Sequence, residues 1–327
     1  MKLKNNKPTN IIFKNKPKLS EHEADSKFNE KRVNLIPSVE DFISSHPMFK
    51  GKEISVTFSH KGVSSLVSII ETVDQKLVFK IRLGGANVDE GKFLEVWEKA
   101  GVKVPHVFEE GILNEHAYSL MEYIDAPTLE EAFNKEELIE KGILYEMGST
   151  LRTMHIPKTE GYGHLTDGKA KYTEFKDWLM SEYMQKKTEY VKENKLLNDE
   201  HGSLSDAREI LINYINNKKS SYCHNDFGTT NIFATNPITV FDPDPVFNNE
   251  YIDLGRAITI RIANDGAFPQ QLIDGYFKGE PYNKKVLQAS ILLNSYMKFA
   301  YWNRVKKIKQ IQNIQKYLTQ TEHLFYD

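Results

Sequence analysis

The segment HNDFGTTN, residues 224–231, combines residue types and a spacing that could carry out chemistry. Its Asp226 is followed by Asn231, and a short, mostly apolar segment then leads to Asp242. An Asp carboxylate can accept the proton of an attacking hydroxyl group. A carboxamide and a second carboxylate supply the hard oxygen ligands that Mg²⁺ prefers. Phosphoryl transfer needs these parts, so the sequence predicts Asp226 as a catalytic base and Asn231 and Asp242 as magnesium ligands.

A second group of charged residues lies upstream, in the apolar segment KLVFKIRL at residues 76–83. On a strand, Val78 and Lys80 share one face, opposite the alternating apolar residues. The Lys80 ammonium could bind the α- and β-phosphates of a nucleotide, and Val78 could cover its adenine ring. Glu90, in the first turn of the next predicted helix, is the expected partner of Lys80. Rival carboxylates for this pairing are Asp89, Glu95 and Glu98.

Further nucleotide contacts are expected from three segments. The loop 59–65 between two predicted strands could cover the phosphates with backbone N–H groups and hydroxyls, although an ordinary hairpin turn is the alternative. The connector that starts at Met121 could bond adenine through its backbone. The expected contact residues are Ser64, Ser65, Glu122, Tyr123, Ile124 and Phe233.

These residues need a scaffold of two lobes, and 327 residues suit such an architecture. Residues 1–47, rich in Lys and Asn, read as an N-terminal extension that is loosely ordered or lies on the surface. Alternating apolar residues predict a β-rich N-lobe over 48–121, followed by a hinge at 122–126. Helical periodicity dominates the predicted C-lobe, 127–327, which is interrupted by a hairpin that ends at Asp242. Its last long stretch, 284–323, also reads as helical.

Composition excludes several classes of protein. Lys and Arg number 43 and Asp and Glu 45, so the net charge of −2 gives no electrostatic reason to expect a nucleic-acid partner. The single cysteine, Cys223, excludes an intrachain disulfide and a cysteine-based metal cluster. No apolar run is long enough to span a bilayer, and the Ile11–Phe13 cluster is too short for a signal peptide. We therefore expect a cytoplasmic protein with no membrane partner.

From about residue 56 onward, the chain resembles the aminoglycoside phosphotransferase family, a small-molecule branch of the protein-kinase-like fold. HNDFGTTN is similar to the family's catalytic loop, TVFD to its metal-binding strand end, EYIDLGRA to its following helix and LVFK to its lysine strand. GVKVPHVFEEG, LRTMH and GYGHL also resemble family segments. The resemblance implies an α+β, two-lobed fold with a small antiparallel β N-lobe and a mainly helical C-lobe. It also implies ATP- or GTP-dependent phosphorylation of an alcohol group, with Mg²⁺.

The alternatives to this prediction are a protein kinase and a catalytically inactive pseudokinase. A protein kinase usually has Arg after the catalytic-loop His and Lys two residues after the base, where this chain has Asn225 and Gly228. The short segment after Asp242 also leaves little room for a peptide-docking loop. A catalytically inactive, nucleotide-binding pseudokinase is disfavoured because the predicted lysine, base and metal ligands are all present. The chain departs from the family at Asp244, which follows Pro243 and could compete as a metal ligand.

The acceptor is expected to be a small-molecule hydroxyl compound. The resemblance favours an aminoglycoside or another amino sugar, and with it a role in antibiotic resistance. Asp265, Asp274 and Glu280 are candidate carboxylates for a cationic acceptor, whereas the basic segment 304–309 does not favour a cation. His224 is expected to bond the backbone of the catalytic loop, and Asp253 to cap a helix or brace that loop.

Overall fold

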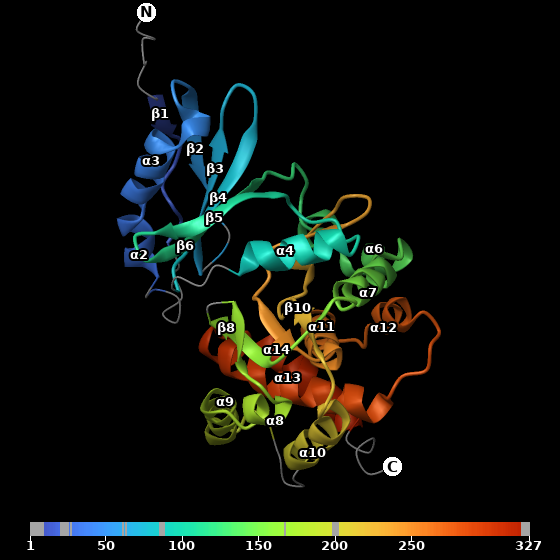
Figure 1. Cartoon of the computed structure of the whole chain (residues 1–327). Helices are drawn as coiled ribbons and strands as arrows, with labels where there is room; N and C mark the ends of the chain where they lie inside the picture. The colour runs from blue at the N-terminus through green and yellow to red at the C-terminus, as the bar shows by residue number, and fades with distance from the viewer. Residues whose placement is uncertain are drawn as a thin grey trace, which may run out of the picture. The chain divides into compact units, whose positions relative to one another are not determined.

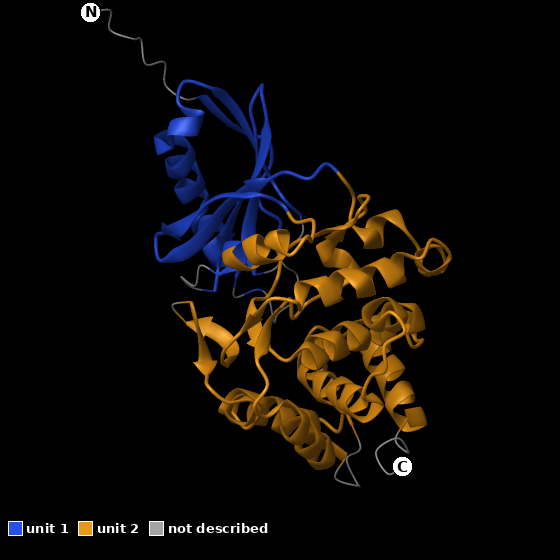
Figure 2. Cartoon of the chain, turned by 45° about the vertical axis from the view of Figure 1, so that its right-hand side comes forward, with its two compact units in different colours: residues 1–91, 105–125 blue, residues 92–104, 126–327 orange. Residues whose placement is uncertain are grey.

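The computed structural model describes residues 10–19, 26, 28–60, 62, 64–84, 89–166, 168–197 and 203–321. The chain divides into two compact units (Figures 1 and 2). Unit 1 comprises Met1–Gly91 and Pro105–Asp125, and unit 2 comprises Lys92–Val104 and Ala126–Asp327. Helix α4 (Glu90–Lys99) begins in unit 1 and continues in unit 2.

Unit 1 is built on a six-stranded sheet with the strand order β1-β2-β3-β4-β6-β5. Its strands are β1 (Asn10–Phe13), β2 (Glu53–Phe58), β3 (Ser65–Glu71), β4 (Lys76–Arg82), β5 (Val107–Leu113) and β6 (His116–Glu122). The pairs from β2 to β5 are all antiparallel. Short connections join β2 to β3, β3 to β4 and β5 to β6, as is usual for antiparallel neighbours, whereas α4 and β5 separate β4 from β6 in the sequence. Strand β1 instead pairs parallel to β2 and was not predicted.

The core of unit 1 lies between this sheet and the helices before β2. Along β2 the buried residues alternate with less buried ones, so one face of the strand supplies apolar side chains. The covering elements are α2 (Asn29–Asn34), α3 (Ile36–Ser45) and the short helix η1 (Pro47–Phe49). Phe42 of α3 stacks on Phe79 of β4 with ring centroids 4.1 Å apart. The described part of residues 1–47 thus contributes a strand and core residues to unit 1.

Unit 2 is mainly helical and also contains a five-stranded sheet, order β7-β10-β13-β8-β9, and the hairpin β11-β12. Its helices are α5 (Leu129–Ala132), α6 (Lys135–Glu140), α7 (Ile143–Met154), α8 (Phe175–Leu179), α9 (Glu182–Glu193), α10 (Ser203–Ile215), η2 (Thr229–Asn231), α11 (Glu250–Asp265), α12 (Gln270–Phe277), α13 (Lys284–Arg304) and α14 (Ile308–Thr321). Its strands are β7 (Lys158–Thr159), β8 (Tyr162–Thr166), β9 (Lys169–Tyr172), β10 (Ser220–Cys223), β11 (Ile232–Phe233), β12 (Thr239–Val240) and β13 (Val246–Asn248).

The last predicted helical stretch, 284–323, contains two helices, α13 and α14. Lys306, which lies between them, has a φ of 57° and cannot continue the first helix. Helix α13 is buried along most of its length, and α9, α10 and α11 all contact it. In the described part of the chain, no helix has both the length and the apolar character that a membrane span requires.

Candidate active site

In unit 1, Lys80 and Glu90 form a buried ion pair. Lys80 lies in the middle of the sheet, opposite Val67 of β3 and Ser119 of β6. Its Nζ donates to both carboxylate oxygens of Glu90, at 2.8 and 2.7 Å. The two side chains are only 6% and 4% exposed. Since a buried charge is stable only when it is paired, the pair fixes the direction of the Lys80 ammonium.

Glu110 on β5 supports the start of α4 and was not among the predicted site residues. Its carboxylate accepts a hydrogen bond of 2.7 Å from the backbone N–H of Gly91 and one of 3.2 Å from the Ser119 hydroxyl. Burial raises the pKa of Glu110, and the nearby Glu90 charge raises it further, although the Gly91 N–H opposes this. A side chain at Gly91 would overlap the Glu110 carboxylate. The first turn of α4, which carries Glu90, is therefore held by a specific contact.

The other predicted nucleotide contacts lie on both units. Ser64 and Ser65 precede and begin β3, but Lys61 and Val63 of the same loop lie outside the described residues. Val78 is partly buried on β4, and Glu122 ends β6 with its backbone N–H bonded to the His106 carbonyl at 2.8 Å. Tyr123 and Ile124 follow β6 in unit 1 and are partly buried, whereas Phe233 belongs to β11 of unit 2 and stacks on Phe241.

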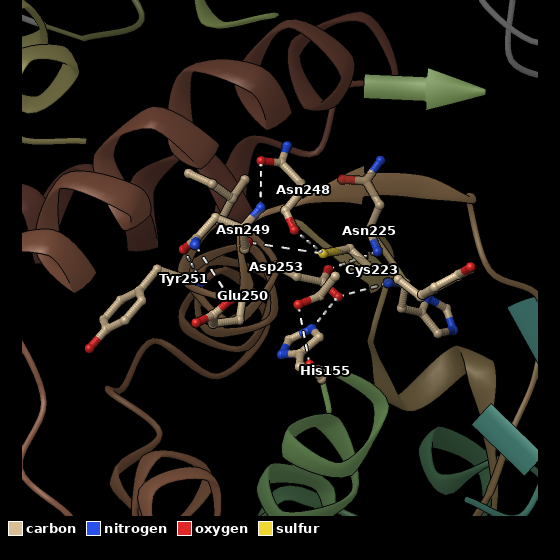
Figure 3. A network of polar contacts seen from close by, with 12 residues as sticks. His155, Cys223, Asn225, Asn248, Asn249, Glu250, Tyr251 and Asp253 are labelled. Carbon is tan, nitrogen blue, oxygen red and sulfur yellow. Dashed lines mark hydrogen bonds and ion pairs between the residues drawn. The ribbon is translucent and has the colours of Figure 1, made fainter. Parts of the chain in front are cut away.

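In unit 2, the loop that contains Asp226 is held by Asp253 of α11 (Figure 3). The Asp253 carboxylate accepts the backbone N–H groups of His224 at 2.7 Å and Asn225 at 2.8 Å. Asn225 has a φ of 60°, a left-handed conformation that Asn adopts more readily than most residues. His155, the residue that follows α7, bonds the same carboxylate at 3.1 Å. Asp253 therefore braces the loop, one of the two roles expected for it.

His224 joins the loop to the following hairpin. Its Nε2 lies 3.0 Å from the Phe241 carbonyl, and its Nδ1 accepts the backbone N–H of Asp226 at 3.3 Å. Its ring also stacks on Trp97 of α4, with the ring planes 3° apart. These contacts use both ring nitrogens in backbone bonds, which is the structural role expected for this histidine.

Asp226 lies between two hydrogen-bond donors. Its Oδ1 accepts from Lys298 Nζ of α13 at 2.7 Å, and its Oδ2 accepts from the Asn231 amide nitrogen at 3.1 Å. Burial alone would raise the pKa of Asp226, but the Lys298 and Arg256 charges outweigh it and hold the pKa well below its usual range. The side chain remains 43% exposed. The carboxylate is therefore ionised and accessible to a hydroxyl group.

Asn231 and Asp242 lie just before and just after the β11-β12 hairpin. The backbone N–H of Phe241 donates to the Asn231 carbonyl at 3.1 Å, so the residue before Asp242 is bonded directly to Asn231. The Asn231 amide nitrogen bonds Asp226, so its amide oxygen is the atom that can face a cation. An amide oxygen and a carboxylate on neighbouring chain segments fit the ligand preference of Mg²⁺. Asp244 is tied to the loop instead, by a 2.8 Å bond from Asn225.

A second cluster with metal-binding residue types is better explained as part of the loop's support. The ligand atoms of His155, Cys223 and Asp253 lie within 4.8 Å of one another (Figure 3). Both nitrogens of His155 are already bonded, one to Asp253 and the other to the Tyr276 hydroxyl at 2.8 Å. Burial and the Asp253 charge raise the pKa of Cys223 well above its usual value, so it remains a thiol, a poor metal ligand.

The carboxylates suggested for a cationic acceptor have partners of their own. Glu280 forms a bidentate pair with Arg152 at 2.7 and 2.8 Å, and Asp265 pairs with Arg261 one turn before it on α11. Asp274 accepts a 2.8 Å bond from Gln270. Lys298, in contrast, was not predicted from the sequence, yet it directly contacts the predicted base.

Comparison with known proteins assigns the family. The model of the phosphotransferase enzyme family matches residues 55–285, which is most of the chain. The chain belongs to this family. No curated protein matches it in sequence. The family match includes Lys80, Glu90, Asp226, Asn231 and Asp242.

Solved structures show that this phosphotransferase family member has the α+β, two-lobed protein-kinase-like fold that the resemblance implied. A thermostable mutant of aminoglycoside phosphotransferase APH(4)-Ia, solved with AMP-PNP and hygromycin B, aligns with a TM-score of 0.60 at 15% identity, over 85% of this chain and 98% of that chain. A choline/ethanolamine kinase family protein from Mesorhizobium loti aligns with a TM-score of 0.52 at 15% identity, over 86% and 99%. Spectinomycin phosphotransferase APH(9)-Ia aligns with a TM-score of 0.51 at 14% identity, over 81% and 90%.

Proposed function

We propose that the chain transfers the γ-phosphate of ATP or GTP to a hydroxyl group of a small molecule, with Mg²⁺ as cofactor. The observation that carries this proposal is the environment of Asp226, an ionised and accessible carboxylate hydrogen-bonded to Asn231 in a chain of the phosphotransferase enzyme family. The small-molecule acceptor is supported by the neighbours, since one was solved with hygromycin B and another with spectinomycin.

In the proposed reaction, the acceptor oxygen forms a bond to the γ-phosphorus while the bond from that phosphorus to the β,γ-bridging oxygen breaks. The hydroxyl proton passes to Asp226, and the nucleoside diphosphate leaves. Because the pKa of Asp226 is low, the carboxylate first orients the hydroxyl by accepting its hydrogen bond. It takes the proton only when bond formation has made the oxygen more acidic.

The roles of the other site residues in phosphate and metal binding are assigned from the chemistry of their side chains. Lys80, oriented by Glu90, would bind the α- and β-phosphates, and Asn231 and Asp242 would hold the metal. Bound Mg²⁺ supplies positive charge that neutralises the phosphate oxygens. Further nucleotide contacts are proposed for Ser64, Ser65, Val78, Glu122, Tyr123, Ile124 and Phe233.

The test is ADP release from Mg·ATP in the presence of a panel of acceptors: aminoglycosides, neutral alcohols, hydroxy acids, sugar phosphates and a generic protein substrate. Asp226→Ala should lower turnover roughly 10²- to 10⁴-fold, because it removes the base. Asp206→Ala, which removes an exposed carboxylate of α10, is the matched control and should retain activity. Equal thermal stability of the two variants would exclude misfolding as the cause.

Three results would contradict the proposal. Undiminished turnover in Asp226→Ala would remove this residue as the base. Phosphorylation of the protein substrate in preference to every small molecule would favour a protein kinase. Nucleotide binding without any transfer or hydrolysis would favour a pseudokinase.

A further inference from the structure

Four basic side chains on three helices of unit 2 interact electrostatically with Asp226 or with one another. Lys298 of α13 contacts the carboxylate at 2.7 Å, and Arg256 of α11 is near enough to lower the pKa of Asp226. Lys187 of α9 and Arg304, the last residue of α13, complete the set. Helices α9 and α11 both contact α13, so the four residues, called here the basic cluster, come from a packed group of helices.

The members of the basic cluster affect one another electrostatically. Burial lowers the pKa of Lys187, and the charges of Arg304, Arg256 and Lys298 lower it further. Both guanidinium groups also act on Tyr183, one turn before Lys187 on α9. The Lys187 ammonium lies 5.4 Å from the centroid of the Tyr183 ring. Like charges that lower one another's pKa also repel one another, so the arrangement is unfavourable unless an anion offsets it.

The basic cluster has few anionic partners. Within the part of the chain that the structure describes, no carboxylate forms an ion pair with Lys187, Arg256 or Arg304. The Arg256 Nε atom is buried and has no hydrogen-bond partner. The acidic groups that act on members of the cluster include Asp226 and Asp244. Asp226 forms its ion pair with Lys298, so the other three cations have no ion-pair partner among the described residues.

The negative charge of the transferring phosphoryl group offsets only part of the positive charge of the basic cluster. Lys298 contacts the Asp226 carboxylate, and its side chain is 14% exposed, so it lies beside the proposed reacting groups. Lys187 is only partly buried, and Arg304 and Tyr183 are exposed. The basic cluster thus includes one residue that contacts the base and others that are accessible to solvent. The carboxylates that could have bound a cationic acceptor, such as Glu280, are paired elsewhere.

We propose that the acceptor is an anionic hydroxy compound, whose carboxylate or phosphate group is bound by Lys187, Arg256 and Arg304 while its hydroxyl group faces Asp226. This inference rests on the proposed phosphotransferase function and narrows its substrate class. Lys298 orients the Asp226 carboxylate and is a positioning residue in this scheme. Guanidinium groups suit the role because they bind carboxylate and phosphate oxygens in a bidentate manner.

The first test compares matched acceptors in the ADP-release assay. Gluconate and glucose 6-phosphate are each compared with glucose, and kanamycin serves as the cationic acceptor. We expect kcat/KM to be at least tenfold higher for one anionic compound than for glucose, and the better of the two identifies carboxylate or phosphate as the recognised group. A preference for glucose or kanamycin would overturn the inference while leaving the phosphotransferase function intact.

The second test changes the charges of the basic cluster. Lys187→Glu and Arg304→Glu should each raise KM for the anionic acceptor roughly 10- to 100-fold, with a smaller change in kcat, because each removes a charge-assisted contact. Lys169→Glu, which reverses a charge on β9 in a different lysine-rich cavity, is the control and should leave KM unchanged. Equal effects of all three substitutions would show a nonspecific response to net charge and would contradict the inference.

If the enzyme turns over no acceptor of the panel, a direct binding experiment tests whether the basic cluster binds anions. Inorganic sulfate and gluconate are titrated calorimetrically into the wild-type chain, into the Lys187→Glu/Arg304→Glu double variant and into Lys169→Glu. Binding that is lost only in the double variant supports the inference. Absent binding, or equal binding to all three proteins, overturns it. The phosphotransferase function is judged separately, by the effect of Asp226→Ala on ATP hydrolysis.

Discussion

At the residue scale, Asp253 shows how a group outside the proposed chemistry holds the groups inside it. Its carboxylate binds two successive backbone N–H groups of the catalytic-loop segment and also His155. Burial by itself raises the pKa of Asp253, but the bond to His155, the nearby histidine charges and the backbone bond outweigh it, so the pKa lies below its ordinary value of 3.8. The ionised form of Asp253 is therefore the form that stabilises the fold.

This shift predicts a pH dependence of stability. A carboxyl group whose pKa is lower in the folded than in the unfolded chain stabilises the fold above its unfolded pKa, and this contribution is lost as the pH falls through its folded pKa. We expect Asp253→Asn to lower the free energy of unfolding by about 3 kcal/mol at pH 7, because buried donors lose a charged acceptor. The difference from wild type should shrink below about pH 4, where the Asp253 carboxyl group of the unfolded chain begins to bind a proton while that of the folded chain is still ionised.

Denaturant unfolding between pH 3 and pH 7 measures this effect. Asp274→Asn, an exposed carboxylate on α12, is the matched control and should change stability little at any pH. A constant difference between wild type and Asp253→Asn across this range would show that the charge of Asp253 is not the stabilising property.

At the element scale, α7 and α12 cross at two glycines. A Cβ atom at Gly148 would overlap the carbonyl oxygen of Leu272, and one at Gly275 would overlap the carbonyl oxygen of Tyr145. The backbones of the two helices therefore meet directly. Helix α7 also carries His155 at its C-terminal end, so this crossing positions the residue that bonds Asp253.

Gly148→Ala should consequently destabilise the protein by about 2–3 kcal/mol, because a backbone atom cannot move aside for the new methyl group. The sign of the stability change is informative, because replacing glycine with alanine at an open helix position would instead stabilise the helix by about 1 kcal/mol. Gly84→Ala, at a position where a Cβ meets open space, is the control and should shift the melting temperature little. A melting temperature for Gly148→Ala at or above the wild-type value would contradict the close crossing.

Elements with a strong periodicity of apolar residues could be predicted from the sequence. Elements that depend on contacts with residues far away in the sequence could not. Alternating apolar residues indicated β2 to β6, and the β11-β12 hairpin was expected around its Pro237 turn. Strand β1 has no fully buried residue, and its short apolar cluster lies in a polar segment. Strand β10 consists of two serines, a tyrosine and a cysteine, so neither strand shows the alternation of apolar and polar residues that indicates a half-buried strand. The break between α13 and α14 involves neither Gly nor Pro but a lysine, Lys306.

The same distinction holds for the candidate site. The spacing of Asp226, Asn231 and Asp242 is local and matches a known chemical pattern, and Glu90 lies ten residues after Lys80. Lys298 is separated from Asp226 by 72 residues, and nothing in the α13 sequence distinguishes it from a solvated lysine. Only the packing of α13 brings the two together. A contact of this kind has no sequence signal in a single chain.

At the scale of the whole molecule, each unit has its own apolar interior. The unit 1 core includes residues of α3 together with residues of the sheet, among them Val39, Phe42 and Phe79. Unit 2 is organised around α13, which is buried over most of its length. Two separate cores allow one unit to lose stability before the other.

Phe42→Ala tests this independence. It should destabilise unit 1 by about 3–5 kcal/mol, because it leaves a cavity beside Phe79. Hydrogen exchange should then rise in β3 and β4 while α11 and α13 keep their protection. Glu40→Ala, on the exposed face of the same helix, should leave both units protected. Equal loss of protection in both units would mean that the chain unfolds as one cooperative block.

Cys223 has a practical consequence for spectroscopy. It is the chain's sole thiol, it is 1% exposed, and its raised pKa keeps it in the unreactive protonated form. Cysteines introduced at exposed positions, one in each unit, would therefore accept fluorophores or spin labels without competition from the native thiol. The separation of such a pair of probes could then be followed by energy transfer while nucleotide and acceptor are added, with no background substitution needed.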